Sequence, residues 1–302
     1  MSHSSNKSRT VRQGAKPGQS GEKRAKGKPQ HQRKGRPPRK SDIPNKDEDA
    51  PIWIYGRHAT LAAVRNPDRR VLDLVATKNA SDWITGEIAK GPVAATGVLN
   101  RMRPERPGGI DQLLPAGAVH QGIAAKVSPL PRFRLKEACA PADLKRPVIV
   151  LDQVTDPQNI GAVIRAAGAL NARAVIVQDR RTPPLAGALA KAAAGALEEV
   201  PIIRTVNISR AMEGLQGLGY YCAGLAGTGR APISDIPRAA PVAIVMGAEG
   251  AGLRQLVSET CDGLYRINIA PNIESLNVAT AAAVALYELT RDTPAGDIGT
   301  QI

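Results

Sequence analysis

The chain has 302 residues, 42% of them hydrophobic and only 3% aromatic, so its core must consist mainly of Ala, Val, Leu and Ile. Its three cysteines are far apart and form no CxxC or Cys/His cluster, which argues against disulfides and zinc and favours a reducing, cytoplasmic setting. No apolar run reaches the ~18 residues of a membrane span, and the basic N-terminus lacks the apolar segment of a secretory signal.

The net charge of +14 is concentrated at the N-terminus. Residues 1–40 contain 13 Lys and Arg and one acid, Glu22, for a net charge of +12. Residues 1–50 have almost no apolar side chains with which to offset the entropy cost of ordering, so a disordered tail is predicted. Such a tail can serve only to keep the protein soluble, or it can attract nucleic-acid phosphates through counterion release. We favour the second interpretation.

Residues 51–128 are predicted to form a small α/β domain. The elements expected there are a strand from residue 52, a turn at Gly56, a helix ending near Asn66, a strand at 71–77, a short helix at 110–117 and a strand at 122–127. The Pro-rich, basic segment 129–146 is predicted to be a linker with a short helix around 135–139.

Residues 147–302 are predicted to form a second domain in which strands and helices alternate. The expected strands lie at 148–154, 172–179, 200–206, 220–227, 241–247 and 264–270. The expected helices lie at 159–170, 185–197, 208–218, 252–261 and 276–291. Continuous apolar strands that alternate with helices indicate an α/β fold with a mostly parallel sheet covered on both faces.

Ligands of such sheets bind beyond the carboxyl ends of the strands, where several loops of this chain can converge. These loops are 156–159, 224–229, 247–252 and 270–275. The first strand of the domain is followed by TDPQN instead of GxGxxG, and the sequence contains no GxxxxGK[ST]. Both absences argue against the usual NAD and ATP sites.

The polar side chains near the expected strand ends are suited to holding a hydroxyl or a phosphate, and they are poor metal ligands, so no metal is predicted. They are Asn159, Arg165, Glu249, Ser275 and Asn277. Each also has a purely structural interpretation. Asn159 can cap a helix, Arg165 can be solvated, and Glu249 can accept from backbone N–H groups of its loop. Ser275 and Asn277 can form an N-cap pair.

Three segments of the second domain resemble the signature motifs of the SPOUT superfamily, and within it those of the TrmH/SpoU branch of RNA ribose 2′-O-methyltransferases. The segments are NIGAVIRAAGALNARAVIV, IVMGAEGAGL and INIAPNIESLNVATAAAVALYEL, and the likeness covers roughly residues 146–291. The first domain resembles the small substrate-binding domain of that branch. The two-domain layout is most similar to members that methylate a guanosine of 23S ribosomal RNA.

The resemblance implies a trefoil-knotted catalytic domain, a homodimer with its active site at the subunit interface, and S-adenosylmethionine as cofactor. By motif match, the backbone contacts to the cofactor fall to Gly224, Gly247, Ile267 and Leu276.

The resemblance also implies roles for the five polar residues. Arg165 would take the proton of the ribose 2′-hydroxyl or act electrostatically, and Glu249 would orient Arg165 or the substrate. Asn159 would lie in the catalytic site besides capping its helix, and Ser275 and Asn277 would surround the reacting ribose.

The sequence leaves three alternatives to this interpretation. The RNA can be a tRNA, the protein can be a non-catalytic RNA-binding factor in ribosome assembly, or it can be a nucleotide-dependent oxidoreductase. The presence of all five polar residues argues against a non-catalytic relative, and the missing GxGxxG argues against the oxidoreductase. Calorimetry with S-adenosylmethionine separates the classes, because an oxidoreductase would not bind it.

Overall fold

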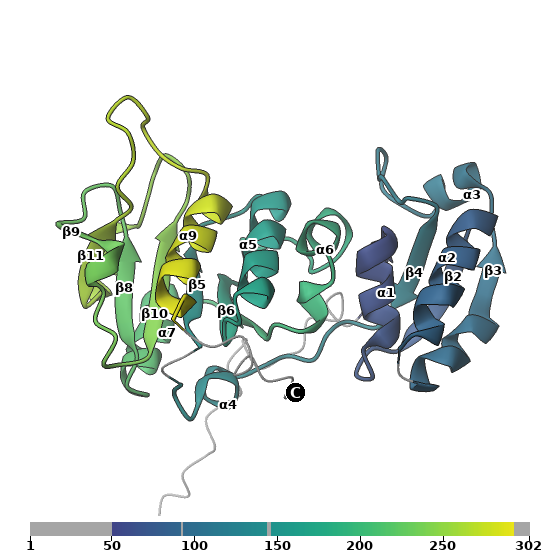
Figure 1. Cartoon of the computed structure of the whole chain (residues 1–302), viewed down its shortest axis with the longest axis horizontal. Helices are drawn as coiled ribbons and strands as arrows, with labels where there is room; N and C mark the ends of the chain where they lie inside the picture. Colours follow the sequence, from purple (N-terminus) through teal and green to yellow (C-terminus); the bar gives the residue numbers. More distant parts are fainter. Residues whose placement is uncertain (1–49, 92, 144–145, 293–302) are drawn as a thin grey trace, which may run out of the picture. The chain divides into compact units, whose positions relative to one another are not determined.

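The computed structural model describes residues 50–91, 93–143 and 146–292, and their strands form two separate sheets (Figure 1). The predicted tail, residues 1–50, lies almost wholly outside the described residues. The described residues belong to one compact unit. The predicted boundaries 51–128, 129–146 and 147–302 therefore stay predictions. None of the helices in the described ranges has the length and hydropathy required to cross a bilayer.

The first sheet has four strands in the order β1-β4-β2-β3. They are β1 (Ile52–Tyr55), β2 (Val71–Ala76), β3 (Met102–Pro104) and β4 (Ile123–Val127). The strand β4 pairs antiparallel with both β1 and β2, whereas β3 runs parallel to β2. Its helical segments are α1 (Arg57–Arg65), α2 (Lys78–Ala89), η2 (Val93–Arg101) and α3 (Pro107–Asp111). The predictions for β1, α1, β2 and β4 are confirmed.

Four elements of this first part differ from the prediction, and η2 and β3 are two that were not predicted at all. The helix expected at 110–117 is wrong, because α3 begins at Pro107, whose fixed φ suits a first helical position, and ends at Asp111. The helix α2 was missed, although Ala80, Ile84 and Ile88 recur every four residues and are all buried.

The second sheet has seven strands in the order β7-β6-β5-β10-β8-β11-β9, and every neighbouring pair is parallel. The strands are β5 (Val148–Asp152), β6 (Ala174–Gln178), β7 (Ile202–Thr205), β8 (Tyr221–Leu225), β9 (Ala231–Pro232), β10 (Val242–Gly247) and β11 (Gly263–Arg266). The predicted parallel sheet is therefore confirmed. The implied knot concerns how the chain threads, and it stays a prediction.

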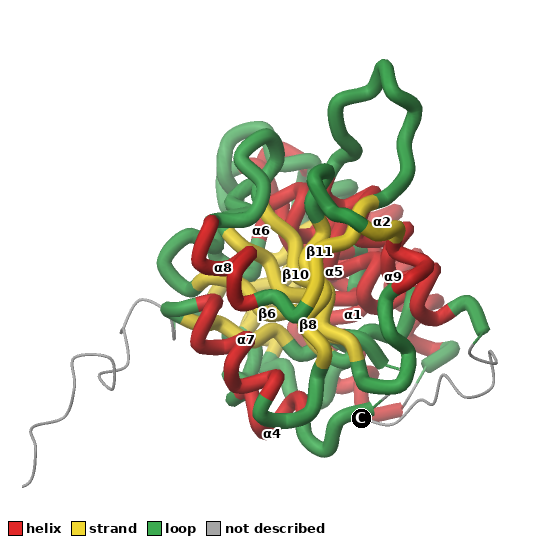
Figure 2. Tube along the Cα trace, turned by 90° about the vertical axis from the view of Figure 1, so that its left-hand side faces the viewer, coloured by secondary structure: helices red, strands yellow, loops and turns green. Residues whose placement is uncertain are grey.

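Helices cover both faces of this sheet, as its apolar strands predict (Figure 2). On one face, Ile149 and Leu151 of β5 share a core with α5 (Pro157–Ala169), α6 (Gly187–Ala193) and α9 (Val278–Thr290). On the other face, Val148 and Val150 share a core with α4 (Leu135–Cys139), α7 (Ile208–Gln216) and α8 (Gln255–Thr260). The short helix predicted around 135–139 is thus confirmed.

Two predicted elements of the second part end early. The helix expected at 185–197 is interrupted, because Ala194 and Gly195 adopt positive φ angles of 50° and 100°, and only a short 3₁₀ turn, η3 (Ala196–Glu198), follows. The strand expected at 264–270 ends at Arg266, whose edge partner Pro232 has no N–H to continue the ladder. The residues after Arg266 instead enter a loop that stands away from the sheet (Figure 1).

Candidate functional site

A cavity of about 290 Å³ lies at the carboxyl ends of β8, β10 and β11. The cavity lies next to the position where the strand order of the sheet reverses. The strands β6 and β7 lie on one side of β5, and β10, β8 and β11 lie on the other. Its lining comes from segments far apart in the sequence: Leu225–Gly227, Met246–Gly250, Gly252, Ile267, Ile269, Glu274–Leu276, Val278 and Ala281. The predicted convergence of loops after these strands is confirmed.

The loop after β10 folds back on itself and forms one wall of this cavity. Gly252 N donates to Ala248 O at 2.9 Å, and Ala251 N donates to Glu249 O at 2.9 Å. A Cβ atom on Gly247 would collide with the carbonyl group of Gly252 and with the nitrogen of Leu253. Glycine at 247 is therefore required by the loop itself, because the returning backbone occupies the space of a side chain.

Three polar side chains from three different elements meet at the rim of the cavity. Asn277 Nδ2 donates to Glu249 Oε1 at 2.7 Å and to Asn159 Oδ1 at 2.9 Å. Asn159 Nδ2 donates to Glu249 Oε1 at 3.2 Å, as does the backbone N–H of Val278. The carboxylate of Glu249 therefore ties the first turns of α5 and α9 to the loop after β10.

The helix caps are partly those that the sequence suggested. Asp156, not Asn159, caps α5 by accepting from Gln158 N at 3.1 Å, which leaves the amide of Asn159 free for Glu249. Asn277 caps α9 alone, since its Oδ1 accepts from Ala279 N and Thr280 N at 2.9 and 3.3 Å. Ser275 is exposed and contributes to the cavity lining instead.

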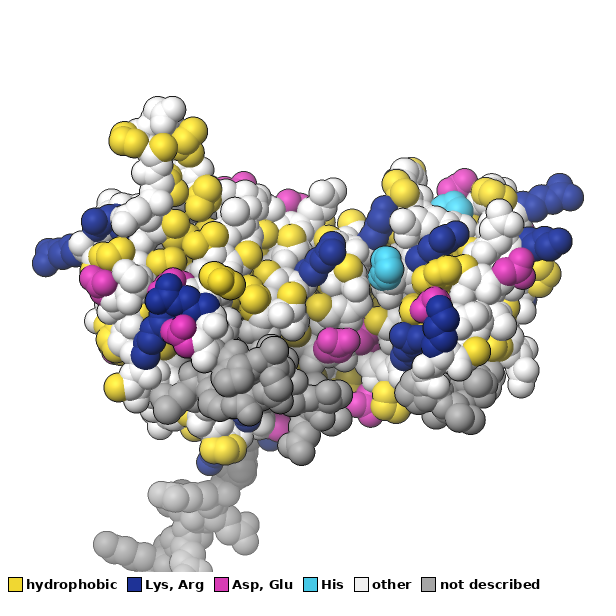
Figure 3. Space-filling model, viewed as in Figure 1, with side chains coloured by type: hydrophobic (Ala, Val, Ile, Leu, Met, Phe, Trp, Pro, Cys, Tyr) yellow, Lys and Arg dark blue, Asp and Glu magenta, His cyan; other side chains and the backbone are white. Residues whose placement is uncertain are grey.

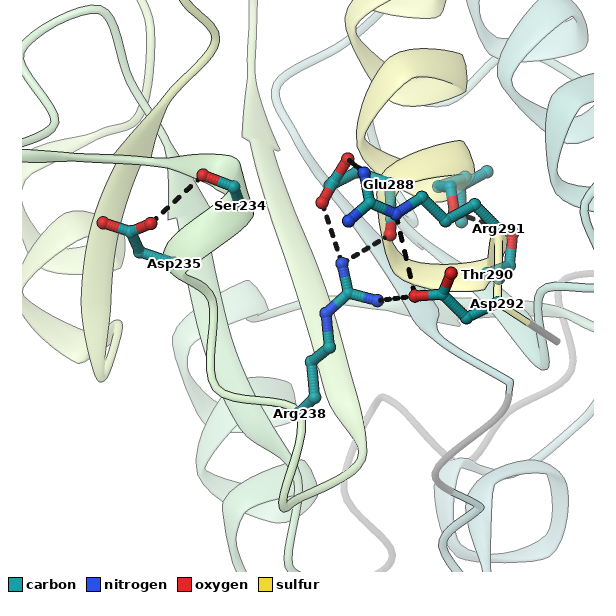
Figure 4. A network of polar contacts seen from close by, with 8 residues as sticks. Ser234, Asp235, Arg238, Glu288, Thr290, Arg291 and Asp292 are labelled. Atoms are coloured by element: carbon teal, nitrogen blue, oxygen red, sulfur yellow. Dashed lines mark hydrogen bonds and ion pairs between the residues drawn. The ribbon is translucent and has the colours of Figure 1, made fainter.

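The opposite end of α9 is held by an ion-pair network (Figure 4). Arg238 Nη2 donates to Glu288 O at 2.7 Å and to Glu288 Oε1 at 2.8 Å. Arg291 Nη1 donates to Glu288 Oε2 at 3.0 Å. With Asn277 at its start and Arg238 at its end, α9 is fixed in place, and so is the amide that contacts Glu249.

Arg165 is exposed on α5, two turns beyond the first turn that carries Asn159. In the described part of the chain, the side-chain hydrogen bonds of Glu249 join it to Asn159, Asn277 and Val278 rather than to Arg165. The structure therefore places Arg165 outside the three-residue cluster, with its side chain exposed.

Three of the four predicted cofactor-binding residues line the cavity, namely Gly247, Ile267 and Leu276. Gly224 lies one residue before the lining, inside β8, where it pairs with Val245 and Leu264. The next residues, Leu225 to Gly227, complete the wall; they belong to the predicted loop 224–229 but were not named individually as cofactor contacts. Their position directly after an apolar strand is the signal that could have indicated them.

The cysteines take no part in the site. Burial raises the pKa of the Cys139 thiol to about 11 and those of Cys222 and Cys261 to about 12. All three stay protonated at neutral pH, as expected of small packed residues. Among the described residues, no group of three or more His, Cys, Asp or Glu is arranged to hold a metal ion.

Replacing Asn277 by Asp tests the link between Asn277 and Glu249. The new carboxylate would keep the acceptor that caps α9 but would lose the donor and face Glu249 with a like charge. At pH 8 we expect Asn277→Asp to melt at a lower temperature than Asn277→Ser, which also keeps a capping oxygen. The difference in the free energy of unfolding between the two variants should be roughly 1 kcal/mol. Equal melting temperatures at pH 8 would contradict the contact.

Sequence comparisons find relatives along most of the chain. Residues 146–287 match the SpoU rRNA Methylase family. The chain is 35% identical over 244 residues to the 23S rRNA (guanosine-2'-O-)-methyltransferase RlmB of Vibrio cholerae, which covers 79% of this chain and 96% of that protein. It is 34% identical over 244 residues to the RlmB of Pseudomonas aeruginosa, with 79% and 95% coverage.

Solved structures of similar fold cover both sheets. The SpoU methyltransferase AviRb of Streptomyces viridochromogenes, in complex with the cofactor AdoMet, superposes with a TM-score of 0.65 at 23% identity, over 82% of this chain and 91% of that chain. An AdoMet-bound rRNA methyltransferase of Sinorhizobium meliloti superposes with a TM-score of 0.67 at 22% identity, over 83% and 90%. At these identities the likeness shows the fold.

Proposed function

We propose, because this chain belongs to the SpoU rRNA methylase family, that it transfers a methyl group from S-adenosylmethionine to the ribose 2′-hydroxyl of a guanosine in 23S ribosomal RNA. The observation that carries the proposal is the cluster of Asn159, Glu249 and Asn277 at the rim of a cavity on the carboxyl ends of the parallel strands. The curated relatives named as enzymes of this specificity match nearly their whole length. An enzyme that acts on ribosomal RNA is expected in the cytoplasm, and we propose this location for the chain.

The cavity suits S-adenosylmethionine in size and in chemistry. Its volume of about 290 Å³ is close to the lower end of the roughly 300–1,000 Å³ typical of small-molecule sites. Apolar side chains such as Leu225, Ile267 and Leu276 can cover the adenine ring. A Cβ atom on Gly227 or Gly250 would meet nothing within 4 Å, so the backbone is open to the polar groups of the ligand.

S-adenosylmethionine, when bound, supplies a methyl group on a positively charged sulfur, so the residues of the chain must mainly align and activate the acceptor hydroxyl. The cluster of Asn159, Glu249 and Asn277 forms a rigid polar rim against which a ribose can be positioned. We assign to Arg165 the contact with the 2′-oxygen and the adjoining phosphate. A guanidinium holds its proton firmly and is a poor base, so electrostatic stabilisation of the developing oxyanion is the role that its chemistry favours.

We propose that the active form is a homodimer in which a second copy completes the site. Apolar side chains gather over α9 and the loop before it (Figure 3). Val284 and Tyr287 of α9 are 38% and 61% exposed, and Ile273 of the loop is 49% exposed. Side chains of this kind on one face mark a protein contact. Arg165 lies exposed on α5, which packs against α9.

RNA recognition is assigned to residues 51–128 together with the basic tail. In the first sheet's layer of helices, the guanidinium of Arg57 lies over the ring of Trp83, 5.2 Å from its centre. Arginine and aromatic planes are the surfaces on which unpaired RNA bases stack. The 2′-hydroxyl must be presented to the enzyme, so a looped or single-stranded RNA segment is the expected substrate.

Calorimetry with S-adenosylmethionine tests the proposal without knowledge of the RNA site. We expect binding of S-adenosylmethionine and of S-adenosylhomocysteine to one cavity, with the two ligands in competition. NAD and ATP should give no heat. Absence of S-adenosylmethionine binding by the folded protein would rule out the proposed activity.

Deleting residues 1–45 should leave a folded protein with unchanged cofactor affinity, because the segment contributes almost no apolar side chains to a core. Affinity for RNA should fall, and its dependence on salt should become weaker, because residues 1–40 carry +12 of the net charge of +14. The measurement is a salt titration of RNA affinity for the full-length and the truncated protein. Equal slopes would show that the tail contributes only solubility.

A further inference from the structure

We propose that Asp152 and Arg254 form a positioning pair that holds the loop of residues 247–253 against β5, and thereby sets both the cavity wall and the orientation of Glu249. The inference rests on the proposed function, because it concerns the same site. Neither residue belongs to the cavity lining or to the polar rim. Their role is therefore to hold other groups in place rather than to touch cofactor or ribose.

Asp152 is the last residue of β5, and in the sheet register it lies beside Gly247 of β10. Its side chain is fully buried, and its hydrogen bonds in the described structure all come from Arg254. Arg254 Nε and Nη2 donate to Asp152 Oδ1 at 2.8 and 2.6 Å, and Arg254 N donates to Oδ2 at 3.1 Å. A buried carboxylate is costly unless it is paired, so these bonds strongly favour one position of Arg254.

Arg254 directly follows the loop and stands at the N-cap of α8. The loop is therefore attached to β5 at both ends, by strand pairing at Gly247 and by the ion pair at Arg254. Between these two points its backbone closes on itself through the bond from Gly252 N to Ala248 O. The loop has little freedom as long as the ion pair is intact.

A second tie joins the same two stretches of chain farther out. Residues 152–159 and 249–254 are linked by Asp152 and Arg254 at the sheet, and by Asn159 and Glu249 at the rim. The outer bond, from Asn159 to Glu249, is exposed and 3.2 Å long. The inner ion pair, between Arg254 and Asp152, is shorter, and its Asp152 side chain is buried. The geometry of the rim thus depends on the inner pair, because exposed hydrogen bonds contribute little on their own.

The pair is tested with Arg254→Gln and Arg254→Lys. The side chain of Arg254 is 43% exposed, so neither substitution has to fit a closed space. Arg254→Gln removes the charge that compensates the buried carboxylate of Asp152, and Arg254→Lys is therefore made beside it. Arg204→Gln is the matched control. Arg204 also ties two strand ends together, with Nε donating to Asp179 Oδ1 at 3.0 Å and Nη2 to Thr182 O at 3.0 Å. It lies on β7, which β6 and β5 separate from the strands that line the cavity.

Two quantities are measured, namely hydrogen exchange of the amides of Ala251 and Gly252 in the cofactor-free protein, and affinity for S-adenosylmethionine by calorimetry. In Arg254→Gln we expect both amides to exchange at least about tenfold faster and the dissociation constant to rise about tenfold. Arg254→Lys, which keeps the charge but loses the two-nitrogen fork, should lie between Gln and wild type. Arg204→Gln should match wild type in both.

The inference is overturned if Arg254→Gln stays within about twofold of wild type in exchange and affinity, or if Arg204→Gln loses as much. Should Arg254→Gln not fold, Arg254→Lys decides by the same two criteria. Failure of the proposed function is a different result. In that case wild-type protein itself does not bind S-adenosylmethionine, while the exchange rates still show whether the pair holds the loop.

Discussion

Arg165→Ala is expected to abolish methyl transfer while leaving the affinity for S-adenosylmethionine within a few-fold of wild type. Arg165 is exposed on α5 and does not belong to the cavity lining, so its removal leaves the proposed cofactor site intact. Loss of one hydrogen-bond donor to a developing oxyanion typically costs about 10²–10³ in rate. The measurements are single-turnover transfer to RNA and calorimetry of the cofactor.

Arg210→Ala is the control for this variant, because it removes an exposed arginine from α7 on the opposite face of the sheet. It should transfer methyl groups at the wild-type rate, which separates the local effect of Arg165 from a general loss of positive charge. Turnover of Arg165→Ala above about a tenth of wild type would contradict its assignment to the reacting ribose.

Gly247→Val is expected to lose most of the affinity for S-adenosylmethionine. A side chain at this position would collide with the backbone of Gly252 and Leu253, and backbone cannot give way as a flexible side chain does. The loop would have to open, which removes one wall of the cavity. We expect a rise in the dissociation constant of at least about 10²-fold, as for a misplacement of about 1 Å in a binding site.

Gly86→Val is the matched control for Gly247→Val, because a Cβ atom at residue 86 of α2 meets nothing within 4 Å. It should bind the cofactor as wild type does. If Gly247→Val folds, as judged by its circular dichroism, and binds with unchanged affinity, then the cofactor does not occupy the cavity at the ends of β8, β10 and β11.

The architecture of the second sheet could be predicted from sequence, because strands buried on both faces leave continuous apolar runs such as VIVLD and VAIVMG. Elements without such a signal were missed. The strand β3 has three residues, too few for a periodic pattern. The break after α6 depends on Ala194, which adopts a positive φ within a run of alanines that otherwise favours a helix.

The candidate site was predictable in its residues but not in its contacts. The motifs indicated Asn159, Glu249 and Asn277, and strand ends of a parallel sheet explain why they lie near one another. Glu249 accepts hydrogen bonds from the side-chain amides of Asn159 and Asn277 rather than from Arg165. This choice depends on the positions of the side chains, which the spacing of the motifs does not predict. The pair of Asp152 and Arg254 was missed because 102 residues separate its members and an acid at a strand end usually indicates only the start of a loop.

The central claim is most directly tested by the product of the reaction. Purified protein is incubated with unmodified 23S ribosomal RNA and S-adenosylmethionine labelled in its methyl group, and the RNA is then digested to nucleosides and analysed by mass spectrometry. We predict that the label is found in 2′-O-methylguanosine and in no other nucleoside, and that it is absent when Arg165→Ala replaces wild type. Label on a base, on another nucleoside or on no nucleoside of this RNA would contradict the account.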